Sequence, residues 1–549
     1  MAKVSRSEAG PAVGRQGMVA SSQPLASEAG LEVLREGGTA VDAALAMNAM
    51  LAVTEPYMCG PGGDLFALLW EPATGQLLGL NASGRSAEGR PLPALRAALG
   101  RRATIPMRGG FGVTVPGAVD GWLALHARGG RLPLSRLFGP AVAVARAGFE
   151  VQPATARGWA IAVGDIAQDP DVAGHLGPFH RCFTLDGRTP AARETMRNSP
   201  LAETFEAIAR DGRPAFYAGS NAGRLCEVVQ DAGGALQPAD LARSQADWVS
   251  PLYGHYRDYQ IAELPPNGQG ACVLQMLHLM QRSPVAPSRA DPCWWHWVLE
   301  AKKLAFADRA RYYADPAFAQ VPLQALLSMD YARARARLIN PERAGDPDPG
   351  ALPGTDTTYF AAADAEGQMV SAIQSIFNPF GSALVVPDGG YALHSRGCAF
   401  SLDASHANAY APGKRPFHTI IPAFALRDGR PWLAFGVIGA DMQPQGQVQV
   451  LSNLLDHGFD VQIAGALPRL RHVGGSQPNG GQEESVVWFE PGIAPAVLDG
   501  LAARGHVLRQ VSPAQGNFMG GYQGILCDAA TGRYQGGSDP RFDGCALGF

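Results

Sequence analysis

Two adjacent threonines, Thr357 and Thr358, stand at the junction between an irregular segment and a β-rich run. Residues 341–356 contain four prolines and three glycines, which is typical of an exposed linker. The run that follows, TTYFAAAD over 357–364, predicts a strand with Thr358 and Phe360 on one face. A linker joined directly to a core strand is expected where the first residue of that strand must become a chain end.

This strand is predicted to return in a hairpin. Residues 364–367 (DAEG) have the composition of a hairpin turn, and residues 368–377 (QMVSAIQSIF) predict the return strand. A further hydroxyl group, that of Ser375, lies on the return strand.

The common catalytic patterns are missing from the sequence. There is no GxSxG, no GxxxxGK[ST] and no HExxH, and GPGGDLF is not a dinucleotide fingerprint. The twelve histidines form no pair at ligand spacing with nearby cysteines. We therefore expect neither a metal ion nor a cofactor.

Composition limits the partners and the location of the chain. The 549 residues are 46% hydrophobic, with a net charge of −4 and a pI near 6.3, so nothing favours binding to nucleic acid. The N-terminus lacks an apolar signal segment, and no run of 18 apolar residues could span a membrane. Eight cysteines without a CxxC pair are expected to be reduced thiols, so we predict a cytoplasmic globular protein.

Periodicity predicts the elements that surround the two threonines. Ser21 or Ser22 could cap the first expected helix, residues 24–36. Thr39 could cap the second, residues 41–52, which is apolar on all sides. The helix over 294–313 is expected to be amphipathic. The later third should alternate short strands with turns, plus a helix near 440–457. The expected helices cover residues 24–36, 41–52, 294–313 and 331–339, and the expected central strand covers residues 65–70.

Several separated motifs, in order, resemble the γ-glutamyltransferase family of N-terminal-nucleophile hydrolases. The resemblance extends over nearly the whole chain and implies an α/β fold, a four-layer αββα sandwich. The motifs are GGTAVDAALAMNAMLAVTEPYMCGPGGDLFAL (37–68), VPGAVDGW (115–122), FYAG (216–219), PPNGQG (265–270), EAKKLAFADRARYYADP (300–316), DTTYF (356–360), GKRPFHTIIP (413–422), GADMQPQ (439–445) and GGSDPRFDG (536–544).

The resemblance implies a precursor that cleaves itself between Asp356 and Thr357. The products would be a large subunit, 1–356, and a small subunit, 357–549, which stay associated as one structural domain and could form a homodimer of heterodimers. Thr357 matches the family's nucleophile. A threonine hydroxyl needs an adjacent base, and the freed α-amine, with a pKa of roughly 7.7–8, supplies one.

Three further positions match the family's catalytic groups. Ser375 matches a hydroxyl that bonds the nucleophile's amine, although it could be an ordinary strand serine. Gly439 and Ala440 match the two backbone amides of the oxyanion hole, where fixed N–H groups stabilise developing charge without reorganisation. Relatives commonly have two glycines there.

The substrate pocket departs from the γ-glutamyl pattern. Ser83 stands where the family has the arginine that holds the substrate's α-carboxylate, and Ala399 stands where it has the aspartate that holds the α-amine. The paired serines after KRP are replaced by His418 and Thr419. Loss of a charge-assisted contact costs about 1.5–3 kcal/mol, so efficient γ-glutamyl recognition is not expected.

Other residues could meet a carboxylate on the acyl group. Arg85, Arg396 and His418 are the candidates, with Thr419 beside them. Arg396 could instead form a structural ion pair, His418 could be a core residue, and Arg85 could be rim surface.

The sequence therefore predicts an enzyme that hydrolyses a small amide with a carboxylate-bearing acyl part, oxamate-like in the first instance. The alternatives are a γ-glutamyl hydrolase or transpeptidase, a β-lactam side-chain acylase, or an inactive relative that only binds.

Overall fold

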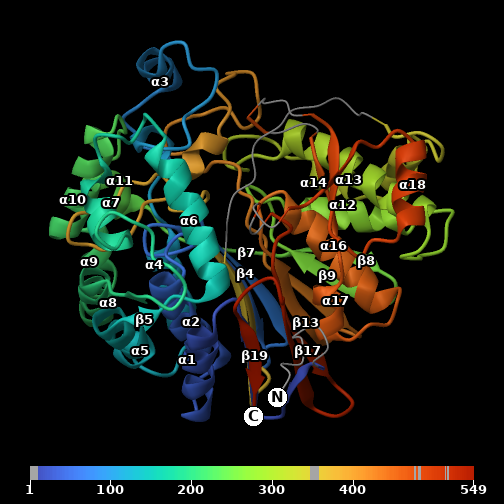
Figure 1. The fold of residues 1–549 in the computed structure, drawn as a ribbon, viewed down its shortest axis with the longest axis horizontal. Helices are drawn as coiled ribbons and strands as arrows, with labels where there is room; N and C mark the ends of the chain where they lie inside the picture. Colours follow the sequence, from blue (N-terminus) through green and yellow to red (C-terminus); the bar gives the residue numbers. More distant parts are fainter. Residues whose placement is uncertain (1–9, 346–357, 475–477, 480–483, 513–514, 516–517) are drawn as a thin grey trace.

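The structure is a computed structural model that describes residues 10–345, 358–474, 478–479, 484–512, 515 and 518–549. Two seven-stranded sheets pack face to face, and helices cover both outer faces (Figure 1). The predicted four-layer αββα sandwich is confirmed.

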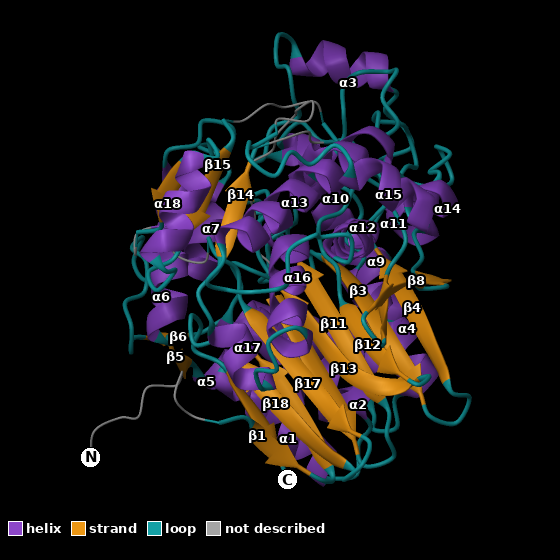
Figure 2. Cartoon of the chain, turned by 90° about the vertical axis from the view of Figure 1, so that its right-hand side faces the viewer, coloured by secondary structure: helices purple, strands orange, loops and turns teal. Residues whose placement is uncertain are grey.

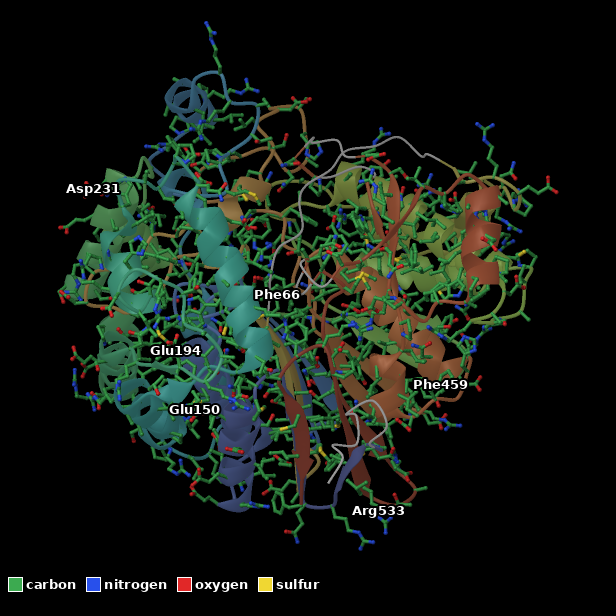
Figure 3. All side chains as sticks on the ribbon, viewed as in Figure 1. Phe66, Glu150, Glu194, Asp231, Phe459 and Arg533 are labelled. Atoms are coloured by element: carbon green, nitrogen blue, oxygen red, sulfur yellow. The ribbon has the colours of Figure 1, made fainter. Side chains whose placement is uncertain are left out.

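The first sheet is antiparallel throughout. Its strands, in spatial order, are β19 (Cys545–Gly548), β2 (Gly17–Ser21), β10 (Thr358–Asp364), β11 (Met369–Ser375), β3 (Asp64–Glu71), β4 (Gln76–Ala82) and β7 (Asp247–Val249). The predicted hairpin is therefore β10–β11, and the predicted central strand 65–70 is β3. Phe66 of β3 lies near the centre of the molecule, whereas Arg533 lies at its edge (Figure 3).

The second sheet is antiparallel as well. Its strands, in spatial order, are β1 (Ala12–Gly14), β18 (Arg533–Ser538), β17 (Tyr522–Asp528), β13 (Arg430–Val437), β12 (Ala423–Arg427), β9 (Tyr259–Glu263) and β8 (Leu252–Tyr256). Figure 2 shows the strands of both sheets lying together in its lower half, with α3 (Leu92–Leu99) projecting at the top. Both sheets combine strands from before and after position 357, so the two parts of the chain share one core.

Helices on the first sheet are α1 (Pro24–Arg35), α2 (Ala40–Thr54) and α4 (Ala118–Gly129), with α5 (Leu134–Ala147) and α8 (Ser199–Asp211) packed behind them. All fifteen residues of α2 are buried, as its apolar sequence predicts, and Thr39 forms a capping box with Asp42. The cap of α1 is Gln23, whose side chain accepts from the Leu25 amide, and not Ser21 or Ser22.

Helices on the second sheet are α12 (Gly270–Met280), α16 (Met442–Leu455) and α17 (Val461–Ala466), with α13 (Pro292–Tyr312) packed on α12. The prediction that 294–313 is amphipathic is wrong, because α13 lies between α12 and α18 (Pro495–Ala503) and is buried on nearly all sides. Its buried charged groups, among them Lys303 and Arg309, pair with other buried polar groups instead of facing water.

The remaining elements are not part of the two large sheets or of the helices named above. They are η1 (Gly110–Gly112), β5 (Phe149–Glu150), α6 (Pro153–Ala167), α7 (Leu176–Phe183), β6 (Thr195–Met196), α9 (Arg213–Tyr217), α10 (Gly219–Asp231), α11 (Pro238–Arg243), α14 (Leu323–Leu326), α15 (Met329–Ala336), η2 (Arg396–Ala399), β14 (Leu470–Val473), β15 (Val486–Phe489) and β16 (Leu508–Gln510). The predicted basic helix 331–339 corresponds to α15.

Three further predictions concern the cleavage site, membrane spans and the cysteines. Asp356, Thr357 and most of the linker 341–356 lie outside the described residues. No helix in the described part combines the length and apolar character that a bilayer crossing requires. The eight cysteines are all unbonded to one another.

Candidate active site

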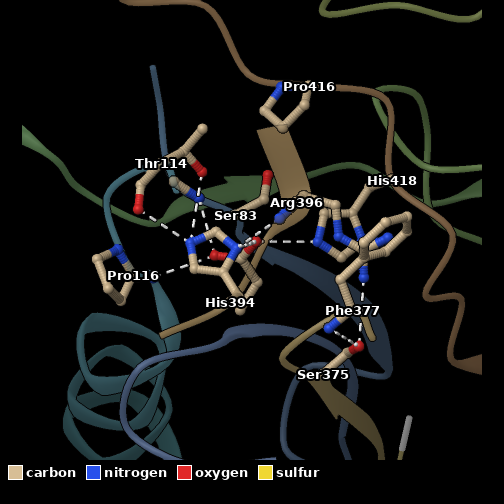
Figure 4. A network of polar contacts seen from close by, with 12 residues as sticks. Ser83, Thr114, Pro116, Ser375, Phe377, His394, Arg396, Pro416 and His418 are labelled. Atoms are coloured by element: carbon tan, nitrogen blue, oxygen red, sulfur yellow. Dashed lines mark hydrogen bonds and ion pairs between the residues drawn. The ribbon is translucent and has the colours of Figure 1, made fainter. Parts of the chain in front are cut away.

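Ser375, where β11 ends, and the Gly439–Ala440 turn, into which β13 leads, are connected by one hydrogen-bond network through Arg396, Thr419 and Gln269. The Ser375 hydroxyl is buried and accepts hydrogen bonds from the Phe377 amide at 2.9 Å and from the Arg396 guanidinium at 3.2 Å (Figure 4). It is therefore tied to a charged side chain and is not an isolated strand serine.

The register of the hairpin places Ser375 beside the cross-strand partner of Thr358. Thr358 pairs with Gln374, the residue before Ser375 on the return strand. Thr358 itself faces the helical layer, where its hydroxyl is 3.2 Å from Glu55 Oε2 and 3.1 Å from Ser22 Oγ.

The turn after β13 presents two backbone amides. Gly439 has φ +108° and Ala440 has φ +49°, so both lie in the left-handed region. Within the described residues neither amide N–H meets an acceptor, whereas both carbonyl groups accept hydrogen bonds from amides of the following helix. The left-handed conformation costs a non-glycine residue such as Ala440 roughly 1–2 kcal/mol, and the alanine keeps its N–H there.

Arg396 lies at the centre of the network in Figure 4. Its side chain is fully buried, donates to Thr419 Oγ1 at 2.7 Å as well as to Ser375, and stacks over the Phe377 ring at 4.1 Å. Burial lowers the pKa of Arg396 to about 9, which leaves it charged at neutral pH. Among the described residues no carboxylate lies within ion-pair distance of it, and its Nε has no partner. The structural ion pair that was its alternative is absent from that part of the chain.

His418 is bonded to a buried carboxylate, that of Asp64, and not to Ser375, Arg396 or Thr419. Its Nε2 lies 3.0 Å from Asp64 Oδ2, and its Nδ1 is bonded by the Ile420 amide. Burial lowers the pKa of His418 to about 3, so the ring is neutral and donates to the aspartate. Burial opposes ionisation of Asp64, but the neighbouring His394, the hydrogen bond from His418 and the positive charge of Arg396 outweigh it and lower the pKa of Asp64 to about 2.

Arg85 is not brought to this group. It lies one-third exposed, 3.4 Å from Asp315 and 3.7 Å from Asp247, and also donates to the Gly413 carbonyl. These contacts place it in a peripheral ion network, which agrees with the rim alternative. The structure therefore brings together Ser375, Arg396 and Thr419, with Gly439 and Ala440 nearby, and leaves Arg85 apart.

Two other features of the described residues lie outside this group. His296, Glu300 and His506 are the residues whose ligand atoms could surround a metal ion. Their atoms already bond one another or their neighbours: His296 bonds His506 and the Asn340 carbonyl, and Glu300 bonds Lys303.

The second feature is an open groove of about 600 Å³ at the sheet edges, lined among others by Trp248, Tyr253 and Arg128. None of the site residues above lines it.

Comparison with known proteins identifies the relatives of this fold. The sequence model described as gamma-glutamyltranspeptidase matches residues 26–549. The chain belongs to the γ-glutamyltranspeptidase family.

Three similar proteins of this family cover nearly the whole chain. The glutathione hydrolase-like YwrD proenzyme of Bacillus subtilis is 35% identical over 98% of this chain and 99% of its own. The oxamate amidohydrolase proenzyme of Klebsiella pneumoniae is 34% identical over 98% of this chain and 99% of its own. The crystal structure of cephalosporin acylase from Bacillus halodurans is 37% identical, covers 99% of this chain and 97% of its own, and has a TM-score of 0.90. The chain is accordingly an amide hydrolase or acylase of the N-terminal-nucleophile class.

The positions where this γ-glutamyltranspeptidase-family chain departs from the γ-glutamyl pattern are buried. Ser83 bonds Asn81 at 2.7 Å, and Asn267 donates to Ser83 and to the Pro416 carbonyl. Ala399 is 1% exposed in η2. A neutral amide cluster and a methyl group thus occupy the places where the resemblance expects an arginine and an aspartate.

Sequence reasoning assigned no role to three residues that organise this site: Asp64, Gln269 and Glu55. All three lie in segments that carry the family resemblance, PGGD, PPNGQG and TEP. A buried polar residue inside such a segment was the available signal, because buried polar groups require partners.

The neutral buried histidines predict an acid-labile fold. His418 and His506 both have a pKa of about 3 in the folded state, well below the ordinary value near 6.5. Between these values the unfolded state binds more protons, so stability is lost as pH falls below about 6.5. Each ring should add a slope of about 1.4 kcal/mol per pH unit to the free energy of unfolding.

Urea unfolding at pH 3.5–8 measures this slope. We expect a plateau above pH 7 and a fall below pH 6.5 that is shallower in His506→Gln by about 1.4 kcal/mol per unit. The exposed His255→Gln is the control. An identical slope in wild type and His506→Gln contradicts the assignment.

Proposed function

We propose that this chain is a self-cleaving N-terminal threonine amidohydrolase that acts on small amides whose acyl part carries a carboxylate, with oxamate-like compounds as the first choice. Cleavage falls between Asp356 and Thr357. The fragments 1–356 and 357–549 then remain together, since both sheets contain strands of each.

The proposed maturation and catalysis use the same group. In the precursor the Thr357 hydroxyl attacks the Asp356 carbonyl carbon, and the peptide C–N bond breaks, which frees the α-amine of Thr357 with the hydroxyl proton. Water then hydrolyses the resulting ester to the Asp356 carboxylate and the Thr357 hydroxyl. In the mature enzyme this amine takes the proton from the hydroxyl as it attacks the substrate amide. The amine of the substrate leaves with a proton, and water hydrolyses the acyl ester.

Two features of the described residues support these roles. Thr358, the first described residue after the proposed cleavage site, pairs with Gln374, which is the direct neighbour of Ser375 on the return strand. The amides of Gly439 and Ala440 meet no acceptor among the described residues, which suits donors reserved for an oxyanion.

The observation that carries the substrate class is the buried guanidinium of Arg396. It is charged and is bonded by two hydroxyl groups. Within the described residues no carboxylate lies at ion-pair distance from it, and the charge of Asp64 acts on it only from farther away. A buried charge is costly unless it is paired, so a substrate carboxylate completes this site.

The short distance between Arg396 and Ser375 also limits the length of the acyl chain. The guanidinium lies 3.2 Å from Ser375 Oγ, the hydroxyl that the family resemblance places beside the nucleophile's amine. A carboxylate held by Arg396 therefore lies only a few bonds from the amide carbon under attack. This favours short dicarboxylic monoamides over the longer γ-glutamyl group, whose α-amine would also lack an aspartate at Ala399.

A β-lactam side-chain acylase is the second candidate. The similarity to cephalosporin acylase, with a TM-score of 0.90, favours it. Its side-chain acyl groups can also carry a carboxylate, so the two candidates differ in acyl length and in the leaving amine.

A panel of amides tests the proposal. We expect ammonia release from oxamate, malonamate or succinamate with a kcat/KM at least about tenfold above that for the neutral oxamide, since one charged contact contributes about 1.5–3 kcal/mol. A γ-glutamyl anilide and a glutaryl-substituted β-lactam complete the panel. Faster turnover of the γ-glutamyl anilide than of every short carboxylate amide contradicts the proposal.

A further inference from the structure

Gln269 contacts the Gly439–Ala440 turn, which presents the two backbone N–H groups proposed as oxyanion donors. It is fully buried at the start of α12. Its side-chain Nε2 donates to the Thr419 carbonyl at 2.6 Å and to the Ala440 carbonyl at 3.0 Å, and its Oε1 accepts from Arg309 at 2.6 Å. Both N–H groups of this amide are therefore committed to two backbone carbonyls from different loops.

Arg309 holds the next residue of the same turn. Its guanidinium is fully buried and bonds both carboxylate oxygens of Asp441, at 2.6 and 3.3 Å. It also lies over the Phe306 and Phe417 rings, at 3.8 and 5.4 Å. A bidentate contact between an arginine and a carboxylate determines orientation as well as position.

These contacts determine how the Gly439–Ala440 turn presents its N–H groups. The Gly439 carbonyl accepts from the Met442 amide at 2.8 Å, which orients the peptide plane that also carries the Ala440 N–H. The Ala440 carbonyl accepts from Gln269, and also from the Gln443 amide at 3.0 Å. The left-handed φ of Ala440 is thus held from both sides, although an alanine does not favour it.

The side-chain amide of Gln269 also connects the Gly439–Ala440 turn to Arg396, the residue proposed to bind the substrate carboxylate. Gln269 bonds the backbone of Thr419, and the hydroxyl of Thr419 bonds Arg396. One side chain therefore spans the distance between the oxyanion donors and the arginine that meets the acyl carboxylate.

We propose that Gln269, held by Arg309, is a positioning residue that orients the Gly439 and Ala440 amides and sets their distance from Arg396. The inference rests on the proposed function. Both acyl transfer to the threonine and hydrolysis of the ester pass through a tetrahedral oxyanion, so misplaced amides slow either step. Binding of the substrate carboxylate in the ground state depends mainly on Arg396. Loss of Gln269 should therefore lower kcat more than it raises KM.

The test compares two buried glutamines of the same helix. Gln269→Met removes the connection, and Gln275→Met is the matched control, because Gln275 bonds Asp308 and Tyr313 instead of the turn. Both are assayed on the best amide of the wild-type enzyme after confirmed cleavage. We expect kcat to fall about 10–100-fold in Gln269→Met with KM within about threefold, since removing one oxyanion donor outright costs about 10²–10³-fold. Gln275→Met should lose similar stability and keep its kcat.

Equal kcat values in the two variants overturn the inference, as does a rise in KM without a fall in kcat. If Gln269→Met does not fold, Gln269→Glu serves instead, because it keeps the volume and an acceptor for Arg309. It places a carboxylate oxygen against the Ala440 and Thr419 carbonyls, so the same fall in kcat is expected, and an unchanged kcat overturns the inference. A wild-type enzyme that hydrolyses no amide contradicts the proposed function, whereas an active wild type with unchanged Gln269 variants contradicts only this inference.

Discussion

Thr357→Ala is expected to remain a single chain of full length and to lose amide hydrolysis by at least about 10³-fold. The variant has neither the hydroxyl that attacks the Asp356 carbonyl nor the nucleophile of the mature site. Denaturing electrophoresis with N-terminal sequencing measures cleavage. Amide turnover measures activity, and a new N-terminus at Thr357 is expected in the wild type only.

Thr358→Ala is the matched control, because it removes the neighbouring hydroxyl of the same strand. Thr358 faces the helical layer and bonds Glu55 and Ser22 there, so its loss should cost about 1 kcal/mol of stability and leave cleavage intact. Cleavage of Thr357→Ala at the same position contradicts the proposal. So does an uncleaved Thr358→Ala that is otherwise folded.

Arg396→Met is expected to lower kcat/KM about 10²–10³-fold for amides with a carboxylate on the acyl group, and far less for neutral amides. A charged hydrogen bond contributes about 1.5–3 kcal/mol, and a guanidinium offers two to a carboxylate. The ratio of the two kcat/KM values, measured on oxamate and oxamide, is the specificity readout.

Arg108→Met controls for the removal of a buried arginine. Arg108 is 7% exposed and donates to the Pro379 and Gly381 carbonyls, near the same loop but without contact to Ser375 or Thr419. It should lose stability and keep the wild-type preference for the carboxylate. A preference that survives in Arg396→Met, or that disappears equally in Arg108→Met, excludes Arg396 as the carboxylate-binding group.

Local sequence was enough to predict the elements around the site. The apolar run of α2 with Thr39 as its cap, the buried strand β3 and the β10–β11 hairpin all depend on periodicity and on turn residues a few positions away. The family and its layered fold could also be predicted, because several motifs occur in a set order along the chain. The amphipathic prediction for α13 failed because whether a charged residue faces water depends on the neighbouring helix, which local sequence does not specify.

Only the tertiary structure decided which charged side chains face the site. Arg85, Arg396 and His418 were equivalent candidates in the sequence, since each could pair with a carboxylate. Arg85 meets Asp315, and His418 meets Asp64 from 354 positions away, so both are engaged elsewhere. Arg396 bonds hydroxyl groups of Ser375 and Thr419 instead. The role of an ionisable residue depends on the charges that folding brings near it, and these come from distant segments, whereas a strand or a helix is largely specified by its own residues.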